Sequence, residues 1–205
     1  NTLLKYLLPS NIINSLANHL MPILILAFFG AEEAGVYFFS IKILATPLFL
    51  ISSSISQVYF QKSSELNHTK SVKLYSTTKK IVFTNLGIMI SFLLTINTLG
   101  IYLLNIFFEN QWKNLNLYIL ILSFLILARS SFNPISSLII VLDKNLVGLI
   151  FNLYLFMINL LALYIGVFYN NIIYTVFILS LFGGIGYFIL LYYFLYQLKK
   201  DKINV

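Results

Sequence analysis

The chain has 205 residues, of which 60% are hydrophobic, 17% are aromatic and only 9% are charged. A soluble domain carries about 25% charged residues, and a soluble fold of this length has too little interior to bury so much apolar surface. We therefore predict an integral membrane protein. The sequence contains no cysteine, which excludes disulfide frameworks, thiolate metal sites and cysteine nucleophiles.

Six apolar segments are long enough to cross a bilayer, because a transmembrane helix needs about 20 mostly apolar residues. In chain order they are 6–29, 36–59, 81–107, 115–142, 146–169 and 172–196. The polar connections between them are 30–35, 61–80, 109–114, 143–145 and 169–171. Most of these connections are short, so successive helices should run antiparallel. The predicted fold class is all-α, a polytopic membrane protein with six transmembrane helices.

The formal net charge is +7, and its placement predicts the orientation. Alternating the six segments puts both ends of the chain and connections 61–80 and 143–145 on one side. That side carries ten lysines: Lys5, Lys62, Lys70, Lys73, Lys79, Lys80, Lys144, Lys199, Lys200 and Lys202. The other side carries only Lys113. Lysine-rich loops stay in the cytoplasm, so both ends should be cytoplasmic.

The basic residues lie in short segments between apolar runs, which does not build a surface that follows a phosphate backbone. We therefore exclude nucleic acid as a partner. The longest connection, 61–80, is interpreted as a solvated connector, with a basic segment lying on lipid headgroups as the alternative. The chain does not begin with Met, and residues 1–29 do not resemble a signal peptide. We expect it to be part of a longer protein.

Two cations lie inside predicted membrane spans. Lys42 is six residues beyond Val36, about 9 Å along the helix, and its long side chain could instead reach outward to the interface. Arg129 is 14 residues before Asp143, about 21 Å, which is too deep for that. A cation at such depth faces a wet cavity, a carboxylate or a ligand. A carboxylate from a missing part of the protein is the alternative to a cavity.

A proline lies five residues after each of these cations. Pro47 follows Lys42 and Pro134 follows Arg129, and Pro22 interrupts the first span. Proline removes a backbone hydrogen bond and can kink the helix, and the freed carbonyl then needs a protein or water partner. We predict helix kinks at these three prolines.

Polar side chains share the predicted spans with the cations. The first span carries a stripe at steps of three and four residues, composed of Asn11, Asn14, Asn18 and His19. Ser130 and Asn133 follow the deep arginine. Such residues line a cavity or hydrogen-bond neighbouring helices, and both interpretations stay open. With only His19 and His68 as histidines, we predict no metal site and no cofactor.

The stretch FFGAEEAGVYFFSIKILATPLFLISSSISQVYFQKSSEL, residues 28–66, carries a recognisable pattern. A loop glycine begins the pattern G-x-Y, and a basic residue within the helix follows it. A proline comes five residues later, and a serine-rich stretch then leads into the cytoplasm. Here these are Gly35, Tyr37, Lys42, Pro47 and 52–65. The stretch resembles the Wzx-type flippases of the multidrug/oligosaccharidyl-lipid/polysaccharide exporter superfamily. The remaining residues match by span count, loop lengths and charge placement.

The resemblance implies a MATE-like transporter of two six-helix lobes, of which residues 1–205 would be the C-terminal lobe and the N-terminal lobe is absent. It implies transport of undecaprenyl-diphosphate-linked oligosaccharide across the bacterial inner membrane for O-antigen, lipopolysaccharide or capsule synthesis. The implied partners are this lipid, the bilayer, the missing lobe, a polysaccharide polymerase and glycosyltransferases. Lys42 and Arg129 would neutralise the diphosphate. The polar residues that would meet phosphates or sugar hydroxyls are Asn14, Asn18, Ser130 and Asn133.

Other functions fit the residues less well. A multidrug exporter of the same superfamily is the closest alternative, but a site for organic cations needs buried carboxylates, and all six acids lie in connections or at span ends. A membrane transferase needs clustered carboxylates, and Glu32 and Glu33 are adjacent and would diverge on a helix. We therefore predict no enzyme. The pattern also contains no sign of a symmetric channel lining.

Overall fold

The computed structural model describes residues 2–69, 71–107, 112 and 114–203, with the side chains of 5–66, 73–104, 106, 112 and 114–200. Within these ranges every regular element is a helix, which confirms the predicted all-α fold. The α-helices are α1 Thr2–Phe29, α2 Ala31–Thr69, α3 Ser71–Thr95, α4 Ile101–Phe107, α5 Leu115–Phe132, α6 Leu138–Val141, α7 Asn145–Phe168 and α8 Ile172–Ile203. A π-helical segment, Ile96–Gly100, joins α3 to α4, and a 3₁₀ turn, Asn133–Ile135, follows α5.

Six helical stretches are long and apolar enough to cross a membrane, as predicted. They are Lys5–Phe29, Ala31–Leu66, Lys73–Leu104, Leu115–Ile135, Asn145–Phe168 and Ile172–Lys200. Large apolar side chains such as Phe83, Leu99 and Phe168 are exposed on their outer surfaces, where lipid rather than water is the matching solvent. The protein is therefore a multi-pass membrane protein.

The first predicted connection is much shorter than expected. A single residue, Gly30, separates α1 from α2, where a connection over 30–35 was predicted. Its φ is +91°, a conformation that glycine adopts without steric cost. Glu32 and Glu33 lie in the first turn of α2, where their negative carboxylates interact favourably with the positive end of the helix dipole. These acids therefore start a helix instead of forming a loop.

The connection predicted over 61–80 is not a loop, because α2 and α3 extend through most of it. The stretch is helical on both sides of Lys70, which lies outside the described residues. Buried contacts hold the two helices together here: the hydroxyls of Tyr59 and Thr78 share a hydrogen bond of 2.6 Å, and Leu74 is only 1% exposed. Lysine, glutamate, glutamine and serine are all tolerated in helices, so a polar stretch of this composition can stay helical outside the membrane.

The connections at 143–145 and 169–171 are as tight as predicted. Asp143 and Asn170 adopt φ values of +50° and +49°, which Asp and Asn tolerate better than other side chains. Lys113, the lysine predicted to stand alone on the opposite side, lies outside the described residues.

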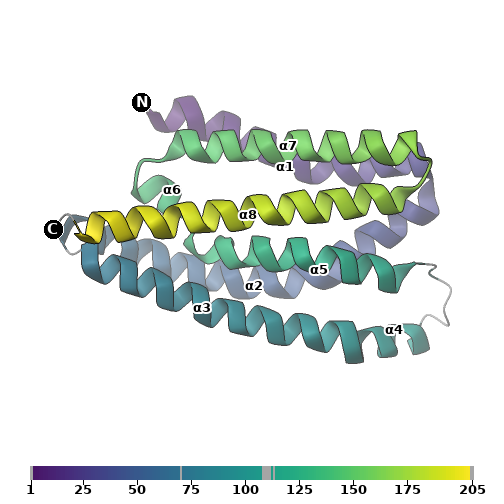
Figure 1. Ribbon diagram of the computed structural model, residues 1–205, viewed down its shortest axis with the longest axis horizontal. Coiled ribbons are helices and arrows are strands. Elements are labelled where there is room, and N and C mark those ends of the chain that lie inside the picture. The colour runs from purple at the N-terminus through teal and green to yellow at the C-terminus, as the bar shows by residue number, and fades with distance from the viewer. Residues whose placement is uncertain (1, 70, 108–111, 113, 204–205) are drawn as a thin grey trace.

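Five helices form a ring in cross-section. α1 packs against α7, α7 against α8, α8 against α5, α5 against α2, and α2 against α1. α3 packs outside this ring, against α2, α5 and α8. In Figure 1, α1 and α7 lie together on one side of α8, while α2, α3 and α5 lie on the other side. The core of the lobe thus forms where α5 and α8 meet, and the ring encloses the space between these two groups.

The sequence FGGIGY, residues 182–187, lets α8 approach its neighbours closely. A methyl group at Gly184 would lie 2.5 Å from the ring of Phe124 on α5. One at Gly186 would lie 2.4 Å from the ring of Tyr154 on α7. Small residues at helix interfaces permit this packing in membranes, so the glycines set how near α5 and α7 come to α8.

Candidate functional site

A cavity of about 810 Å³ lies within the ring of five helices. Its polar lining is contributed mainly by α1, α2, α5 and α7. The polar and charged lining residues are Asn14, Asn18, His19, Tyr37, Lys42, Arg129, Asn152, Asn159 and Tyr187. The two cations inside predicted spans therefore face the same cavity, from α2 and α5. Among the described residues, no carboxylate lines it.

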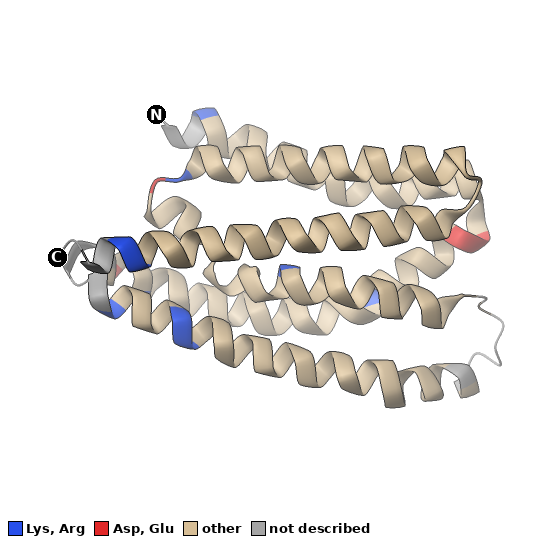
Figure 2. Ribbon diagram, in the orientation of Figure 1, with Lys and Arg blue, Asp and Glu red and all other residues tan. Residues whose placement is uncertain are grey.

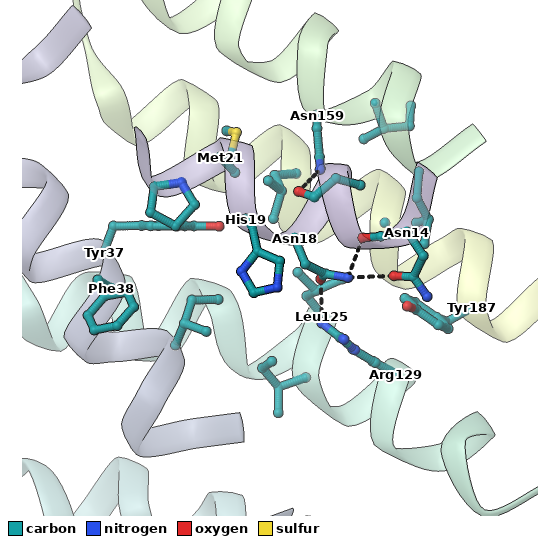
Figure 3. Close-up of a pocket in the computed structure, with 18 of the residues that line it drawn as sticks. Asn14, Asn18, His19, Met21, Tyr37, Phe38, Leu125, Arg129, Asn159 and Tyr187 are labelled. Carbon is teal, nitrogen blue, oxygen red and sulfur yellow. Dashed lines mark hydrogen bonds between the residues drawn. The ribbon is translucent and has the colours of Figure 1, made fainter. Parts of the chain in front are cut away.

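Arg129 is half-buried and is held by neutral amides. One guanidinium nitrogen donates to the side-chain oxygen of Asn18, at 3.1 Å. The Asn18 amide in turn donates to the backbone oxygen of Asn14 at 2.8 Å and to its side-chain oxygen at 2.5 Å (Figure 3). The chain of contacts orients the guanidinium without neutralising its charge. A guanidinium has five N–H donors, so most stay available for another acceptor.

Lys42 is exposed in the part of the cavity wall that α2 contributes. Its Nζ lies 5.2 Å from the centre of the Phe38 ring, one turn earlier on α2, in cation–π geometry. This contact leaves the ammonium charge uncompensated by any acid among the described residues. Two positive charges thus reach one cavity from different helices.

Pro134 interrupts the helix that carries Arg129. The α-helix ends at Phe132 and a 3₁₀ turn follows, because proline has no N–H to continue the ladder. The carbonyl of Ser130, four residues before the proline, accepts a hydrogen bond from the Asn85 side chain of α3 at 2.8 Å. The freed carbonyl thus has a protein partner. At Pro22 and Pro47 the α-helix continues through the proline.

Ser130 and Asn133 do not line the cavity. Ser130 is only 4% exposed. Asn133 lies in the 3₁₀ turn, where its carbonyl accepts the hydroxyl of Ser136 at 2.8 Å. In a continuous α-helix, Asn133 would share a face with Arg129, four residues earlier. The helix ends first, so this face is not extended.

The family described as polysaccharide biosynthesis protein matches residues 3–117, which are 115 of the 205 residues. The chain belongs to this family. The match covers α1, α2, α3 and α4, and includes Asn18 and Lys42 of the cavity, while Arg129 lies beyond it. Membership indicates a role in polysaccharide synthesis or export. Comparisons with curated proteins and with solved structures give no match.

In this polysaccharide biosynthesis protein, two cavity asparagines were not anticipated from the sequence. Asn152 of α7 donates to the hydroxyl of Ser10 at 2.8 Å and to its carbonyl at 3.2 Å, and Asn159 donates to the carbonyl of Ala17 at 2.8 Å. Both contacts join residues 142 apart, so α1 and α7 run parallel in register. The available signal was the spacing of seven residues, which places both asparagines on one helical face.

The histidines of this polysaccharide biosynthesis protein do not form a metal site within the described side chains. No group of three His, Cys, Asp or Glu residues comes together there. His19 is exposed and lines the cavity beside Asn18, as Figure 3 shows. The side chain of His68 lies outside the described residues.

Proposed function

We propose that this polysaccharide biosynthesis protein is a flippase for a lipid-linked oligosaccharide whose linkage is an anionic diphosphate. The observation that carries the proposal is the pair Lys42 and Arg129. The two residues face one cavity inside membrane-spanning helices, and no described carboxylate lines that cavity. We propose the bacterial inner membrane as the location and undecaprenyl diphosphate as the lipid carrier.

The charges support an anionic cargo. A cation at the centre of a membrane helix costs about 2.5–3.5 kcal/mol on insertion scales, so two uncompensated cations are retained at a considerable cost. A diphosphate carries a negative charge on each phosphate and would compensate both. Arg129 would present a planar fork of donors to one phosphate, and Lys42 a point charge to the other.

The amides of the cavity suit the rest of the head group. Asn14 and Asn18 lie next to Arg129, where they would meet phosphate oxygens or the first sugar hydroxyls. The side-chain nitrogens of Asn152 and Asn159 donate hydrogen bonds to α1. Their side-chain oxygens then remain as acceptors for sugar hydroxyls. Ser130 and Asn133 have no part in this proposal.

The charge distribution supports an orientation with the basic end in the cytoplasm. Figure 2 shows lysines gathered at the end of the lobe that contains both termini, while acidic residues lie at both ends. The described lysines at the basic end are Lys5, Lys62, Lys73, Lys79, Lys80, Lys144, Lys199 and Lys200. Such a bias matches the positive-inside rule. The proposed transport direction is from this side to the other.

The test uses the full-length protein in cells that lack their own copy. Lys42→Gln and Arg129→Gln should each reduce surface polysaccharide by about tenfold or more, the effect of losing one charge-assisted hydrogen bond. Lipid-linked sugar should accumulate in the inner leaflet. Lys79→Gln is the matched control, because its Nζ also lies over a phenylalanine ring, Phe83 at 5.8 Å, but outside the cavity. It should leave export unchanged.

The double variant gives the clearest contradiction. Normal surface polysaccharide in Lys42→Gln with Arg129→Gln, at matched membrane levels, would show that the cations do not meet the cargo. Equal losses in the Lys79→Gln control would show that the effect is not specific to cations in the cavity.

A further inference from the structure

The cavity-lining part of α5 is bounded by two polar contacts from neighbouring helices. Leu125, Ile126 and Arg129 line the cavity. On one side, the hydroxyl of Ser180 on α8 donates to the carbonyl of Ile121 at 2.5 Å and accepts the N–H of Leu125 at 3.3 Å. α5 remains an α-helix through both residues, so this contact ties α8 to α5 without ending the helix.

On the other side, Pro134 leaves the carbonyl of Ser130 without its helical donor. Asn85 of α3 supplies the missing hydrogen bond, at 2.8 Å. Asn85 is 1% exposed, and Ser130 follows Arg129 directly in the chain. Membrane helices tolerate proline when a neighbouring helix satisfies the freed backbone groups in this way.

We propose that Asn85 is a positioning residue for Arg129. It never touches the cavity, and it acts by fixing the backbone next to Arg129 so that the guanidinium points at Asn18 and into the cavity. Its importance for transport rests on the proposed function, but its effect on the direction of the guanidinium does not.

The physical reason is the cost of an unpaired buried carbonyl. Without Asn85, the carbonyl of Ser130 would have no donor in an apolar surrounding. The last turn of α5 before Pro134 is the part that can turn to expose this carbonyl to another donor, because the α-helix ends at Phe132 and the chain continues as a 3₁₀ turn. Turning it moves the Arg129 side chain away from Asn18. A leucine at position 85 has similar volume, so packing between α3 and α5 would be kept while the hydrogen bond is lost.

A charge-sensing measurement tests the geometry without cargo. Residues 1–205 contain no cysteine, so Asn14→Cys, in a background free of other cysteines, provides one reporter thiol in the cavity wall. Position 14 is one helical turn from Asn18, whose side chain contacts both Asn14 and the guanidinium. The labelling rates of anionic and cationic methanethiosulfonate reagents are compared. A unit charge at about 9 Å in water changes the ratio of these two rates by about fivefold.

Arg129→Gln removes the charge and should lower the anionic-to-cationic rate ratio by about fivefold. Asn85→Leu keeps the charge but moves it away from position 14, so it should lower the same ratio by about half as much on a logarithmic scale, about twofold. The matched control is Asn97→Leu, in the π-helical segment that follows α3. Asn97 also donates its amide to α5, to the Ser123 hydroxyl at 2.8 Å, but it has no contact with the backbone beside Arg129. A ratio unchanged by Asn85→Leu, or lowered equally by Asn97→Leu, would overturn the proposal.

A second experiment restores the backbone N–H that Pro134 lacks, so the conclusion does not depend on Asn85→Leu alone being stable. Pro134→Ala returns an N–H four residues after Ser130, so Asn85 is no longer needed as donor. Adding Asn85→Leu to Pro134→Ala should then leave the rate ratio of Pro134→Ala unchanged. A further decrease would show that the amide acts by some other route and would overturn the proposal.

Binding of undecaprenyl diphosphate to the protein in nanodiscs separates this proposal from the proposed function. Asn85→Leu should weaken binding about as much as Arg129→Gln, and should have no added effect in combination with it, as expected for coupled residues. Additive losses would overturn the positioning role. Unchanged binding in Arg129→Gln would instead overturn the proposed function, and the reagent-charge ratio would then decide the positioning role alone.

Discussion

Gly186 offers a direct test of how closely α8 packs against α7. An added methyl group would lie 2.4 Å from one ring carbon of Tyr154 and within 3.3 Å of two others, so the ring must move by about 1 Å to reach normal van der Waals distance. It cannot swing freely, because its hydroxyl donates to the carbonyl of Phe182 at 2.8 Å. Overpacking costs about 1–3 kcal/mol, and loss of this hydrogen bond adds about 1 kcal/mol. Gly186→Ala should therefore destabilise the protein by about 3 kcal/mol.

Thermal unfolding in a mild detergent measures this effect. For a chain of this size, about 3 kcal/mol corresponds to a decrease in Tm of about 6–12 °C. The matched control is Gly87→Ala, also within a helix, where an added methyl group meets nothing within 4 Å. That change should stabilise by about 0.5–1 kcal/mol, because alanine loses less backbone entropy than glycine.

A double variant separates the steric overlap at Gly186 from the effect of the Tyr154 hydrogen bond to the Phe182 carbonyl. Tyr154→Phe removes the hydroxyl that holds the ring, so its combination with Gly186→Ala should cost less than the sum of the two single changes. The reasoning would be refuted if Gly186→Ala kept the Tm of the parent protein or matched Gly87→Ala.

Two further predictions concern the α1–α7 contact and the orientation. Asn159→Leu removes the hydrogen bond to the carbonyl of Ala17 and should lower stability by about 1 kcal/mol, seen as a Tm decrease of about 2–4 °C; an unchanged Tm would mean that this hydrogen bond does not help to hold α1 against α7. Cysteines introduced by Glu32→Cys and Lys80→Cys, both at exposed positions, should react with an impermeant thiol reagent from outside and from inside respectively. The reverse pattern would invert the orientation.

Hydropathy predicted the number and order of the six membrane helices because it measures how well 20 residues partition into hydrocarbon. It did not predict where the helices end. At 61–80 the residues are polar but compatible with helix, and the contact between Tyr59 and Thr78 that joins the two helices is tertiary. Connection 30–35 collapsed to Gly30 because glycine alone can make the turn and the following acids favour a helix start.

The candidate site was predicted where single-helix geometry is enough. Asn14 and Asn18 share a face at a step of four, and depth singled out Arg129, so all three came together as expected in the cavity. Asn133 does not line the cavity, because α5 ends at Phe132 and the 3₁₀ turn that follows does not continue the helical face that carries Arg129. Asn159 was missed because its importance depends on which helix packs against α7, and sequence spacing alone does not give that neighbour.

The one-residue link at Gly30 has a mechanical consequence. It holds the C-terminal end of α1 next to the N-terminal end of α2, so any rotation between these helices pivots about Gly30. α1 has 28 residues and is about 42 Å long, so a rotation of about 10° displaces its free end by about 7 Å and its linked end hardly at all. The distance between α1 and α2 therefore increases mainly toward the lysine-rich end. α7 moves with α1, because Asn152 and Asn159 hydrogen-bond the α1 backbone at Ser10 and Ala17.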